Sequence, residues 1–439
     1  MRPRLVSANH DSSAIEGKMG TSSNPAATVL NNLPEIRSWQ EDLYRDIHQH
    51  PEQSHQEHRT ARLAADKLRG SGFEVLNGIG GTGVVGVKRN GSGPTVLMRA
   101  DMDALPVEEA TGLPYASTVR ATDAAGNETP VMHACGHDVH VTCLLGAAAL
   151  LADGIQHWNG TALALFQPAE EAGDGARGMV DDGLVDAIPP VDVALAQHVL
   201  PAPAGHVGTH RGPVLSAADS VRITVYGRGA HGSMPQAAVD PVVLAAMIVV
   251  RLQTIISREV APTDTVVLTI GSIHAGSKSN VIDDHAVLEF NVRTYDESVR
   301  TVVLDAIRRI VIAECQASNS SKPPDFQLYD RFPLTVNDDE VTYRVGDAFA
   351  RYFGERFQPM AAQSASEDFS DIPKALGVPY TYWGIGGIDE RQYFNAADAG
   401  RVSQDIPVNH SPTFAPVIQP TLDTGTEALI VAALDWLAP

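Results

Sequence analysis

The segment Val131–Val141 holds a dense group of potential metal-binding side chains. Cys135 and His137 lie two residues apart in it, and thiolate and imidazole are groups that bind zinc-like ions. Three further candidates flank this pair, namely His133, Asp138 and His140. The apolar run Thr142–Leu151 follows and indicates a buried helix, so the group lies where a loop enters a helix and the helix dipole favours anionic ligands. One such pair is a weak signal by itself, and its meaning depends on ligands from the rest of the chain.

Three apolar runs that are expected to form strands each lead directly into polar side chains. The runs and the residues that follow them are Thr95–Ala100 with Asp101 and Asp103, Thr161–Phe166 with Glu170 and Glu171, and Val191–Ala196 with His198. Short, continuous apolar runs are typical of strands that are buried on both faces of a largely parallel sheet. Ligands of open α/β sheets bind outside the carboxyl ends of the strands. We therefore expect these side chains to meet the Cys135–His137 loop at one sheet edge and to form a metal site.

The adjacent residues Glu170 and Glu171 suit a division of labour in hydrolysis. A zinc-like ion lowers the pKa of water toward about 7, and a carboxylate beside it can take up the proton and pass it to a leaving nitrogen. One glutamate can therefore bind metal while its neighbour moves protons. Successive residues of a strand point to opposite faces, so both side chains reach one site only if the backbone is irregular after Pro168.

A thiolate can bridge two metal ions, so five side chains are enough to hold a pair of ions. The candidate ligands are Cys135, His137, Glu171, His198 and His410. Glu170 is the candidate general base. Asp103 is a candidate for an outer carboxylate that holds a ligand histidine in the correct tautomer.

Other polar residues near these motifs have structural explanations as well as functional ones. Asp101 and Asp138 can be ligands, outer carboxylates or caps of turns and helices. His133 and His140 are expected to be outer or core residues rather than ligands. A surface location is expected for four histidines of the N-terminal helix and loop: His48, His50, His55 and His58.

The pattern of elements changes from about Val214 onward. Strands and helices then follow in the order β-α-β-β-α-β, over Ser220–Tyr226, Pro241–Ser257, Thr265–Ile270, Ala286–Tyr295, Glu297–Gln316 and Phe326–Tyr329. This order is the split βαβ, or ferredoxin-like, arrangement. We therefore expect an α/β protein in which a mostly parallel-sheet catalytic domain, residues 29–213 and 324–439, carries an inserted domain at residues 214–323. Residues 1–28 mix small, polar and charged residues and are expected to be a disordered tail.

Residues of the inserted domain could contact a substrate that the catalytic domain holds. His231 lies between an expected strand and an expected helix, in the segment Ala230–Pro235. Arg293 lies on the polar face of an alternating strand, and a guanidinium near a histidine and an amide such as Asn280 can bind a carboxylate bidentately. A turn residue and a solvated sheet face are the structural alternatives for His231 and Arg293.

The segment Gly78–Gly83 matches G-x-G-x-x-G, the glycine pattern of dinucleotide-binding proteins. That pattern requires a strand before it and a helix after it. Here Val84–Val87 continues as a strand, which predicts a turn and not a cofactor site. We expect Val84–Val87 and Thr95–Ala100 to be strands joined by the turn Asn90–Gly93.

Composition excludes some classes of partner. The 439 residues include 32 Lys and Arg and 53 Asp and Glu, a formal charge of −21, which argues against nucleic acid or an anionic membrane as partner. The same acidity also serves solubility. No apolar run is long enough to predict a membrane span. Three cysteines are too few for a disulfide framework, so a reducing, cytoplasmic compartment is expected.

Together, the motifs resemble the zinc-dependent aminoacylase and carboxypeptidase-like family, in particular its branch of hippurate hydrolases, N-acyl-amino-acid amidohydrolases and indole-acetyl-amino-acid hydrolases. The matching segments, in family order, are Arg99–Pro106, Met132–Asp138, Phe166–Glu171, Gln197–His198, Gly229–Pro235, Ser366–Phe369 and Asn409–His410. The resemblance implies a binuclear site, with zinc as the expected ion and Mn or Co as alternatives, held by Cys135, His137, Glu171, His198 and His410. It also implies Glu170 as the base.

The same resemblance assigns a role to the inserted domain. It implies a homodimer that forms through this domain, in which His231 reaches the active site of the other subunit. Asn280 and Arg293 fall where the family contacts the carboxylate of the substrate.

These features predict a metal-dependent amidohydrolase that cleaves the amide bond of N-acyl or N-aroyl amino acids and releases a carboxylic acid and a free amino acid. Two alternatives stay open. The same binuclear site could serve a dipeptidase or exopeptidase. The protein could also be a catalytically retired, metal-binding dimeric scaffold, although the intact Glu170–Glu171 pair argues against it.

Overall fold

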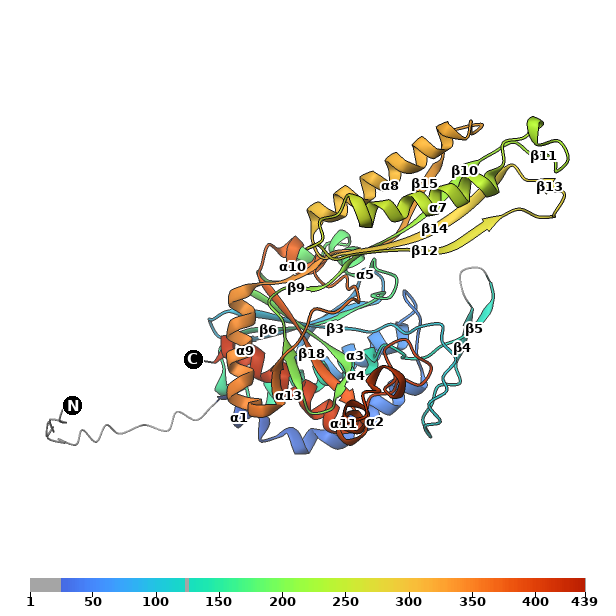
Figure 1. Cartoon of the computed structure of the whole chain (residues 1–439). Helices are drawn as coiled ribbons and strands as arrows, with labels where there is room; N and C mark the ends of the chain where they lie inside the picture. The colour runs from blue at the N-terminus through green and yellow to red at the C-terminus, as the bar shows by residue number, and fades with distance from the viewer. Residues whose placement is uncertain (1–24, 123–125, 439) are drawn as a thin grey trace, which may run out of the picture.

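The structure is a computed structural model of the chain, and it describes residues 25–122 and 126–438 (Figure 1). Most of the expected N-terminal tail lies outside the described residues. Its boundary at residue 28 is wrong, because helix α1 (Pro25–Leu30) already begins at Pro25. Ala26, Val29 and Leu30 are buried in the main core, and this packing holds the short helix in place.

The catalytic part is built on an eight-stranded sheet with the order β1-β2-β6-β3-β7-β18-β8-β17. The strands are β1 (Glu74–Ile79), β2 (Gly83–Asn90), β6 (Gly160–Gln167), β3 (Thr95–Asp101), β7 (Val193–Pro203), β18 (Tyr380–Ile388), β8 (Val207–Thr209) and β17 (Phe357–Pro359). The four central strands β6, β3, β7 and β18 are parallel to one another. The expectation of a mostly parallel sheet is therefore confirmed for its centre, whereas β1 and β2 run antiparallel to their neighbours.

Strands β2 and β3 are not sheet neighbours, although they follow one another along the chain. Strand β6 lies between them and pairs with both, so the expectation that the turn Asn90–Gly93 joins a hairpin is wrong. The glycine segment Gly78–Gly83 forms the tight link between the antiparallel strands β1 and β2. The prediction of a turn there is confirmed.

Helices cover both faces of the sheet (Figure 1). One core contains residues of α2 (Leu33–Gln49), α3 (His58–Gly70), α4 (His137–Asp153), α9 (Asp339–Phe353) and α13 (Ile418–Leu437). The other contains residues of α5 (Gly175–Asp181) and α10 (Asp371–Leu376). In β3, Val96 and Met98 belong to the first core and Leu97 to the second. The continuous apolar sequence of the strand follows from this burial on two faces.

The inserted unit has the expected element order, β10 (Ala217–Tyr226), α7 (Pro241–Arg258), β12 (Val266–Ala275), β14 (His285–Thr294), α8 (Glu297–Ala317) and β15 (Asp325–Phe332). Its antiparallel sheet has the order β12-β14-β10-β15. The ferredoxin-like arrangement is thus confirmed. Because β15 pairs with β10, the unit extends to Phe332, beyond the expected boundary at residue 323.

The inserted unit projects from the body as an arm (Figure 1). Its joint contains β9 (Gly212–Leu215) paired with β16 (Thr335–Asn337). Its tip carries the two short strands β11 (Ala230–His231) and β13 (Val281–Ile282). Among the described residues, α7 is the one helix that is long and apolar enough to cross a membrane by length and composition. Its side chains Leu244, Ile248 and Leu252 are buried in the core of the unit, as expected for a helix that packs on its own sheet.

Candidate metal centre

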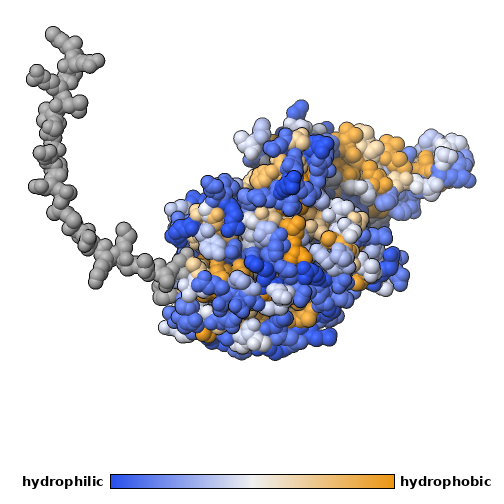
Figure 2. Space-filling model, turned by 90° about the horizontal axis from the view of Figure 1, so that it is seen from below, coloured by the Kyte–Doolittle hydropathy of each residue, from blue (hydrophilic) through white to orange (hydrophobic). Residues whose placement is uncertain are grey.

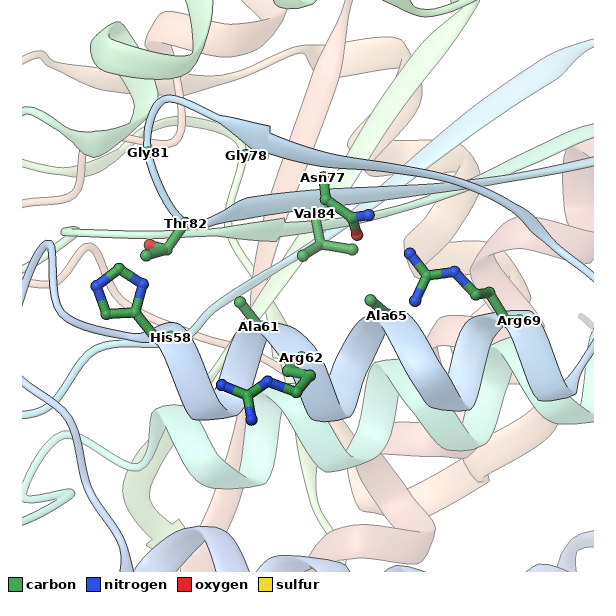
Figure 3. A pocket seen from close by; sticks show the side chains of 10 residues that line it. All are labelled: His58, Ala61, Arg62, Ala65, Arg69, Asn77, Gly78, Gly81, Thr82 and Val84. Carbon is green, nitrogen blue, oxygen red and sulfur yellow. The ribbon is translucent and has the colours of Figure 1, made fainter.

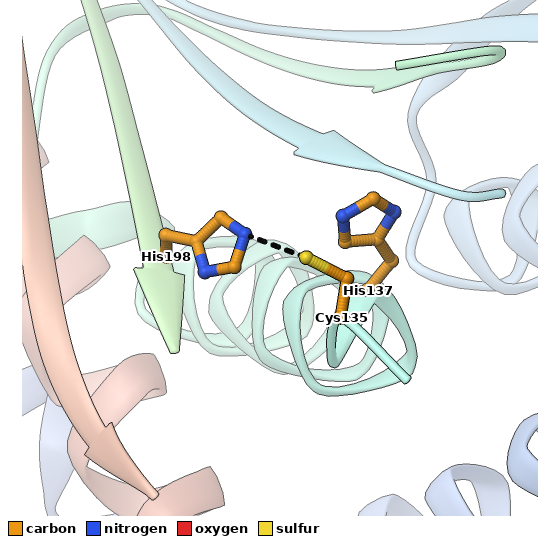
Figure 4. A group of neighbouring side chains, drawn as sticks. All are labelled: Cys135, His137 and His198. Atoms are coloured by element: carbon orange, nitrogen blue, oxygen red, sulfur yellow. Dashed lines mark hydrogen bonds between the residues drawn. The ribbon is translucent and has the colours of Figure 1, made fainter. Parts of the chain in front are cut away.

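Cys135, His137 and His198 meet at the carboxyl end of the parallel strands (Figure 4). Cys135 lies in the loop before α4, and His137 is the first residue of that helix. His198 lies inside β7, which continues to Pro203, and not after the end of a strand as expected. The Sγ atom of Cys135 is 3.4 Å from Nε2 of His198. One potential ligand atom from each of the three residues lies within 4.8 Å of the others.

Glu171 and His410 complete a second group with the same cysteine. Nε2 of His410 is 3.4 Å from Oε1 of Glu171, and Nε2 of His137 is 3.8 Å from that oxygen. Cys135, Glu171 and His410 again offer atoms within 4.8 Å of one another. Cys135 therefore belongs to two overlapping sets of donors, and the structure brings all five expected ligand residues together.

The donor set fits zinc-like ions, because its free atoms point into the cluster. Nδ1 of His137 lies 3.2 Å from Oδ1 of Asp103, and Nδ1 of His198 lies 2.7 Å from the carbonyl oxygen of Val199. These acceptors fix the protons on Nδ1 and leave both Nε2 lone pairs for the cluster. Nε2 of His137 and Oε1 of Glu171 are buried and have no hydrogen-bond partner among the described residues. A buried polar atom without a partner costs about 1–3 kcal/mol, which a bound cation would remove.

Buried negative charge around the cluster also favours cations. Burial and the neighbouring carboxylates Glu171 and Glu170 raise the pKa of the Cys135 thiol well above its usual value. Burial, Glu367 and Glu171 likewise raise the pKa of Glu170. These shifts mean that the site is crowded with groups that resist ionisation in the absence of a positive partner. Divalent ions would stabilise the thiolate and the carboxylates together.

The irregular backbone that the Glu170–Glu171 pair requires is present. Ala169 has φ 50°, a left-handed conformation that non-glycine residues rarely adopt. The chain leaves β6 at Gln167 and turns here, so both glutamates reach the cluster. Gly136, in the loop between Cys135 and His137, also has a left-handed backbone, with φ 89°. A Cβ atom at Gly136 would lie 2.4 Å from Cγ1 of Val199, so Cys135 and His137 can approach β7 because glycine separates them.

Asn409 connects the loops that carry the candidate ligands. Its Nδ2 group donates to the carbonyl oxygens of Cys135 (3.0 Å) and Val199 (3.1 Å). The N–H group of His410 donates to the carbonyl oxygen of Ala134 at 2.8 Å. Sequence reasoning assigned no role to Asn409, and its position directly before His410 was the available signal.

Asp101 and His140 support the cluster from outside. Oδ1 of Asp101 lies 2.6 Å from Nδ1 of His140, and Nε2 of His140 accepts the N–H of Val199 at 2.8 Å. Both nitrogens of His140 are therefore used, which agrees with the expected outer position.

Arg99 was not recognised as important, although an arginine in an apolar strand was a signal. It is buried and donates to Asp101 (2.6 Å) and Glu367 (2.7 Å).

His48 does not have the expected surface location. It is buried and lies 2.6 Å from Oδ2 of Asp138 and 3.2 Å from Oε1 of Glu109. These two carboxylates raise the pKa of His48 to about 10 against the effect of its burial. Asp138 thus supports the start of α4 rather than binding metal. His133 is buried in the core.

A cavity of about 770 Å³ opens above the cluster, between the catalytic part and the near end of the inserted unit. Arg293 contributes to its wall and donates to the carbonyl oxygen of Ser364 (2.8 Å) and to Oγ of Ser366 (3.1 Å). His231 and Asn280 do not line this cavity. They lie together at the tip of the arm, where the N–H of Gly232 donates to the carbonyl oxygen of Asn280 at 2.8 Å. Within one chain, therefore, only Arg293 of these three faces the cluster.

A second, smaller cavity of about 290 Å³ lies between α3 and the β1–β2 hairpin (Figure 3). It is lined by His58, Arg62, Arg69, Asn77 and Thr82 among others. None of the candidate ligands lines it. The chemistry of the protein is therefore expected in the larger cavity.

Comparison with known proteins agrees with this geometry. Residues 97–399 match the peptidase family M20/M25/M40. The chain is 39% identical to thermostable carboxypeptidase 2 of Saccharolobus solfataricus over 72% of this chain and 79% of that protein. It is 38% identical to hippurate hydrolase of Campylobacter jejuni over 80% of this chain and 90% of that protein. The crystal structure of Bacillus subtilis YxeP, described as a dinuclear metal-binding peptidase, has a TM-score of 0.72 at 27% identity, covering 91% of this chain and 98% of that one.

Proposed function

Because the chain belongs to peptidase family M20/M25/M40, we propose that it is a metal-dependent amidohydrolase that cleaves N-acyl amino acids into a carboxylic acid and a free amino acid. The main observation in support of this function is that two groups of potential metal ligands share Cys135, and that Glu170 lies beside them on the wall of one cavity. Relatives named hippurate hydrolase and N-acetyl-L-cysteine deacetylase support this choice of substrate. The intact cluster argues against a catalytically retired scaffold.

The residues of the chain divide the work of hydrolysis. Two divalent ions, with zinc expected and Mn or Co as alternatives, would be held by Cys135, His137, Glu171, His198 and His410. When bound, such ions polarise a carbonyl oxygen and lower the pKa of water. Glu170 takes a proton from the attacking water and delivers it to the leaving nitrogen. Asp103 holds His137 in the required tautomer, and Arg293 offers a guanidinium to the carboxylate of the substrate.

The cavity supports an apolar acyl group that is larger than acetyl. Leu200, Met360 and Val408 line the same cavity as His198 and His410. Gly384 makes room for this apolar surface, because a Cβ atom there would lie 2.4 Å from Leu200 and 3.3 Å from Met360. An acyl chain on this surface would be shielded from water while the amino-acid carboxylate faces Arg293.

A series of N-acylated derivatives of one amino acid tests the function and this preference together. We expect kcat/KM to rise by about fourfold per buried methylene from acetyl to hexanoyl. Met360→Ala should flatten this rise and leave acetyl turnover unchanged, whereas Val185→Ala, which does not line the cavity, should change neither. Flat or falling values along the series would exclude the apolar subsite. No release of amino acid from any member would exclude the proposed reaction.

A dipeptidase or exopeptidase activity is the second candidate. It is favoured by the similarity to proteins named thermostable carboxypeptidases. The same measurements on dipeptides of the same amino acid separate the two candidates. Higher kcat/KM for dipeptides than for every acyl derivative would establish the second.

We also propose a homodimer that forms through the inserted unit. Helix α7 exposes Val242, Val243, Met247 and Val250, which keep 45–68% of their surface accessible, and apolar surface gathers on the arm (Figure 2). Strand β12 beside it is an edge of its sheet and offers unpaired backbone groups to another strand. A second copy would cover both features. His231 and Asn280 at the tip do not line the cavity of their own chain. A second copy would bring them to the cavity of the other subunit.

Charges placed on α7 should therefore separate the subunits. The double substitution Met247→Glu with Val250→Glu buries two carboxylates in the proposed interface, and we expect the mass in analytical ultracentrifugation to fall from two chains to one. Leu328→Glu, on the opposite edge strand β15 and 50% exposed in the wild type, should leave the dimer intact. A monomeric wild type, or a doubly charged variant that stays dimeric, would contradict this arrangement.

The three free, buried cysteines support the further proposal of a cytoplasmic location.

A further inference from the structure

The turn from Pro168 to Gly175 presents both glutamates of the centre and is tightly constrained. Ala169 has φ 50° at its start, and the N–H of Gly175 donates to the carbonyl oxygen of Ala169 at 3.2 Å. A Cβ atom at Gly175 would lie 1.7 Å from the carbonyl oxygen of Pro168. A non-glycine residue in this conformation persists only where the surroundings fix it. Something must therefore hold Ala169 in place.

The buried carboxylate of Glu57 provides such a contact. Oε1 of Glu57 accepts the N–H of Ala169 at 2.9 Å and the N–H of His55 at 2.9 Å. Oε2 accepts the hydroxyl of Thr82 at 2.6 Å. Glu57 has no exposed surface. Its one side chain therefore joins three segments that lie far apart in the sequence, and Figure 3 shows Thr82 above the first turn of α3.

The other end of the turn is held separately. Oδ2 of Asp368 accepts the N–H of Ala176 at 2.9 Å, and Oδ1 of Asp368 lies 2.5 Å from Nε2 of Gln167. Asp368 thus fixes the strand before the turn and the helix after it. Glu57 contacts the residue directly before Glu170, where the strained conformation lies. The N–H of Glu171 donates to Oδ2 of Asp103 at 2.9 Å, so Asp103 holds the turn at the second glutamate while Glu57 holds the strained residue directly before the first.

We propose that Glu57 is a positioning residue for the centre: it fixes the N–H of Ala169 and thereby holds the turn that directs Glu170 and Glu171 into the cluster. The role in turnover rests on the proposed function. The role in metal binding does not, because Glu171 belongs to the donor cluster whatever the substrate. Misplacing a reacting group by about 1 Å can lower a rate about 100-fold, and loss of an outer partner lowers metal affinity about 10- to 100-fold.

Two substitutions of Glu57 separate a positioning role from a role of charge. Glu57→Ala leaves Ala169 N–H without its acceptor, and we expect kcat to fall about 100-fold with KM within about threefold. We expect zinc affinity of the metal-free protein, measured by competition with a chromogenic chelator, to fall at least about tenfold. In Glu57→Gln the amide oxygen still accepts from Ala169 and the NH₂ group can donate to Thr82. This variant should recover zinc affinity and kcat to within about threefold of wild type.

Two matched variants control for general destabilisation. Glu52 accepts the N–H groups of Arg59 and Thr60 at 2.8 Å each and caps the same helix without contacting the turn. Glu52→Ala should lower the melting temperature and leave zinc affinity unchanged. Thr82→Val removes one hydrogen bond of Glu57 and spares the bond to Ala169, so zinc affinity should change by less than about threefold.

The outcomes are distinct. A folded Glu57→Ala variant with wild-type zinc affinity and kcat would overturn the proposal. So would a Glu52→Ala variant with the same loss, which would trace the effect to α3, or a Glu57→Gln variant as impaired as Glu57→Ala, which would trace it to charge. If no acyl amino acid is hydrolysed by the wild type, the proposed function fails. The zinc affinities then still decide the role of Glu57.

Discussion

Replacing Glu170 with glutamine should lower kcat at least about 1000-fold, within the range that general acid–base groups contribute, while the metal content is unchanged. Glu170 is buried, with 5% of its surface exposed, and burial with Glu367 and Glu171 raises its pKa. A carboxylate with raised proton affinity can take a proton from water and return it to the leaving nitrogen. Glutamine has nearly the same shape but cannot do so. The measurement combines turnover of the best acyl amino acid with metal analysis of the same sample.

Glu171→Gln is the matched variant, because it changes the neighbouring side chain in the same way. It should lose metal as well as activity, since Oε1 of Glu171 lies close to both His137 and His410. The two variants therefore separate proton transfer from metal binding. If Glu170→Gln kept turnover within about tenfold of wild type, general-base catalysis by this residue would be excluded.

Replacing Cys135 with serine should weaken metal binding more than any substitution in a single donor group. Cys135 is the residue common to the two groups that together contain the five candidate ligands, so its thiolate is expected to contact both ions. A serine hydroxyl does not ionise at neutral pH and is a poor ligand for zinc. Loss of a residue that only hydrogen-bonds to a metal ligand lowers metal affinity about 10- to 100-fold. Because Cys135 is expected to bind the ions directly, we expect the affinity to fall at least about 100-fold. Calorimetric titration of the metal-free variant measures the number of sites and their affinities.

Cys143→Ser provides the control. Cys143 is also buried and lies in α4, the helix that follows Cys135, but its Sγ atom contacts the carbonyl oxygen of Leu422 at 3.5 Å and takes no part in the cluster. Its substitution should lower stability slightly and leave the number of bound ions unchanged. Equal losses of metal in both variants would mean that the helix, and not the thiolate of Cys135, is responsible.

The sequence predicted the parts of the site that depend on local pattern. Apolar runs identified β3, β6 and the start of β7, and parallel strands place their carboxyl ends on one edge. Asp101 and Glu170 therefore came together as expected. The requirement for an irregular backbone followed from the alternation of side chains in strands, and the φ of Ala169 satisfies it. Residue type indicated the five candidate ligands, His410 among them, and the resemblance implied the same set for a binuclear site.

The sequence did not predict features that depend on distant contacts. A turn at Asn90–Gly93 is compatible with a hairpin, but local residues do not reveal that β6 enters between β2 and β3. His48 has a polar helical environment in sequence, and its burial depends on carboxylates from two other segments. Glu57 gave no local signal either, because its partner Ala169 lies more than a hundred residues away. Such contacts become visible only after the chain folds.

Native mass spectrometry of the folded protein in zinc tests most directly whether two ions share the Cys135 thiolate. The wild-type chain should carry two zinc ions, and Cys135→Ser should carry fewer at the same free zinc concentration, while Cys143→Ser keeps two. A wild-type chain that saturates with one ion, or a Cys135→Ser chain that keeps two ions with unchanged affinity, would contradict a shared thiolate.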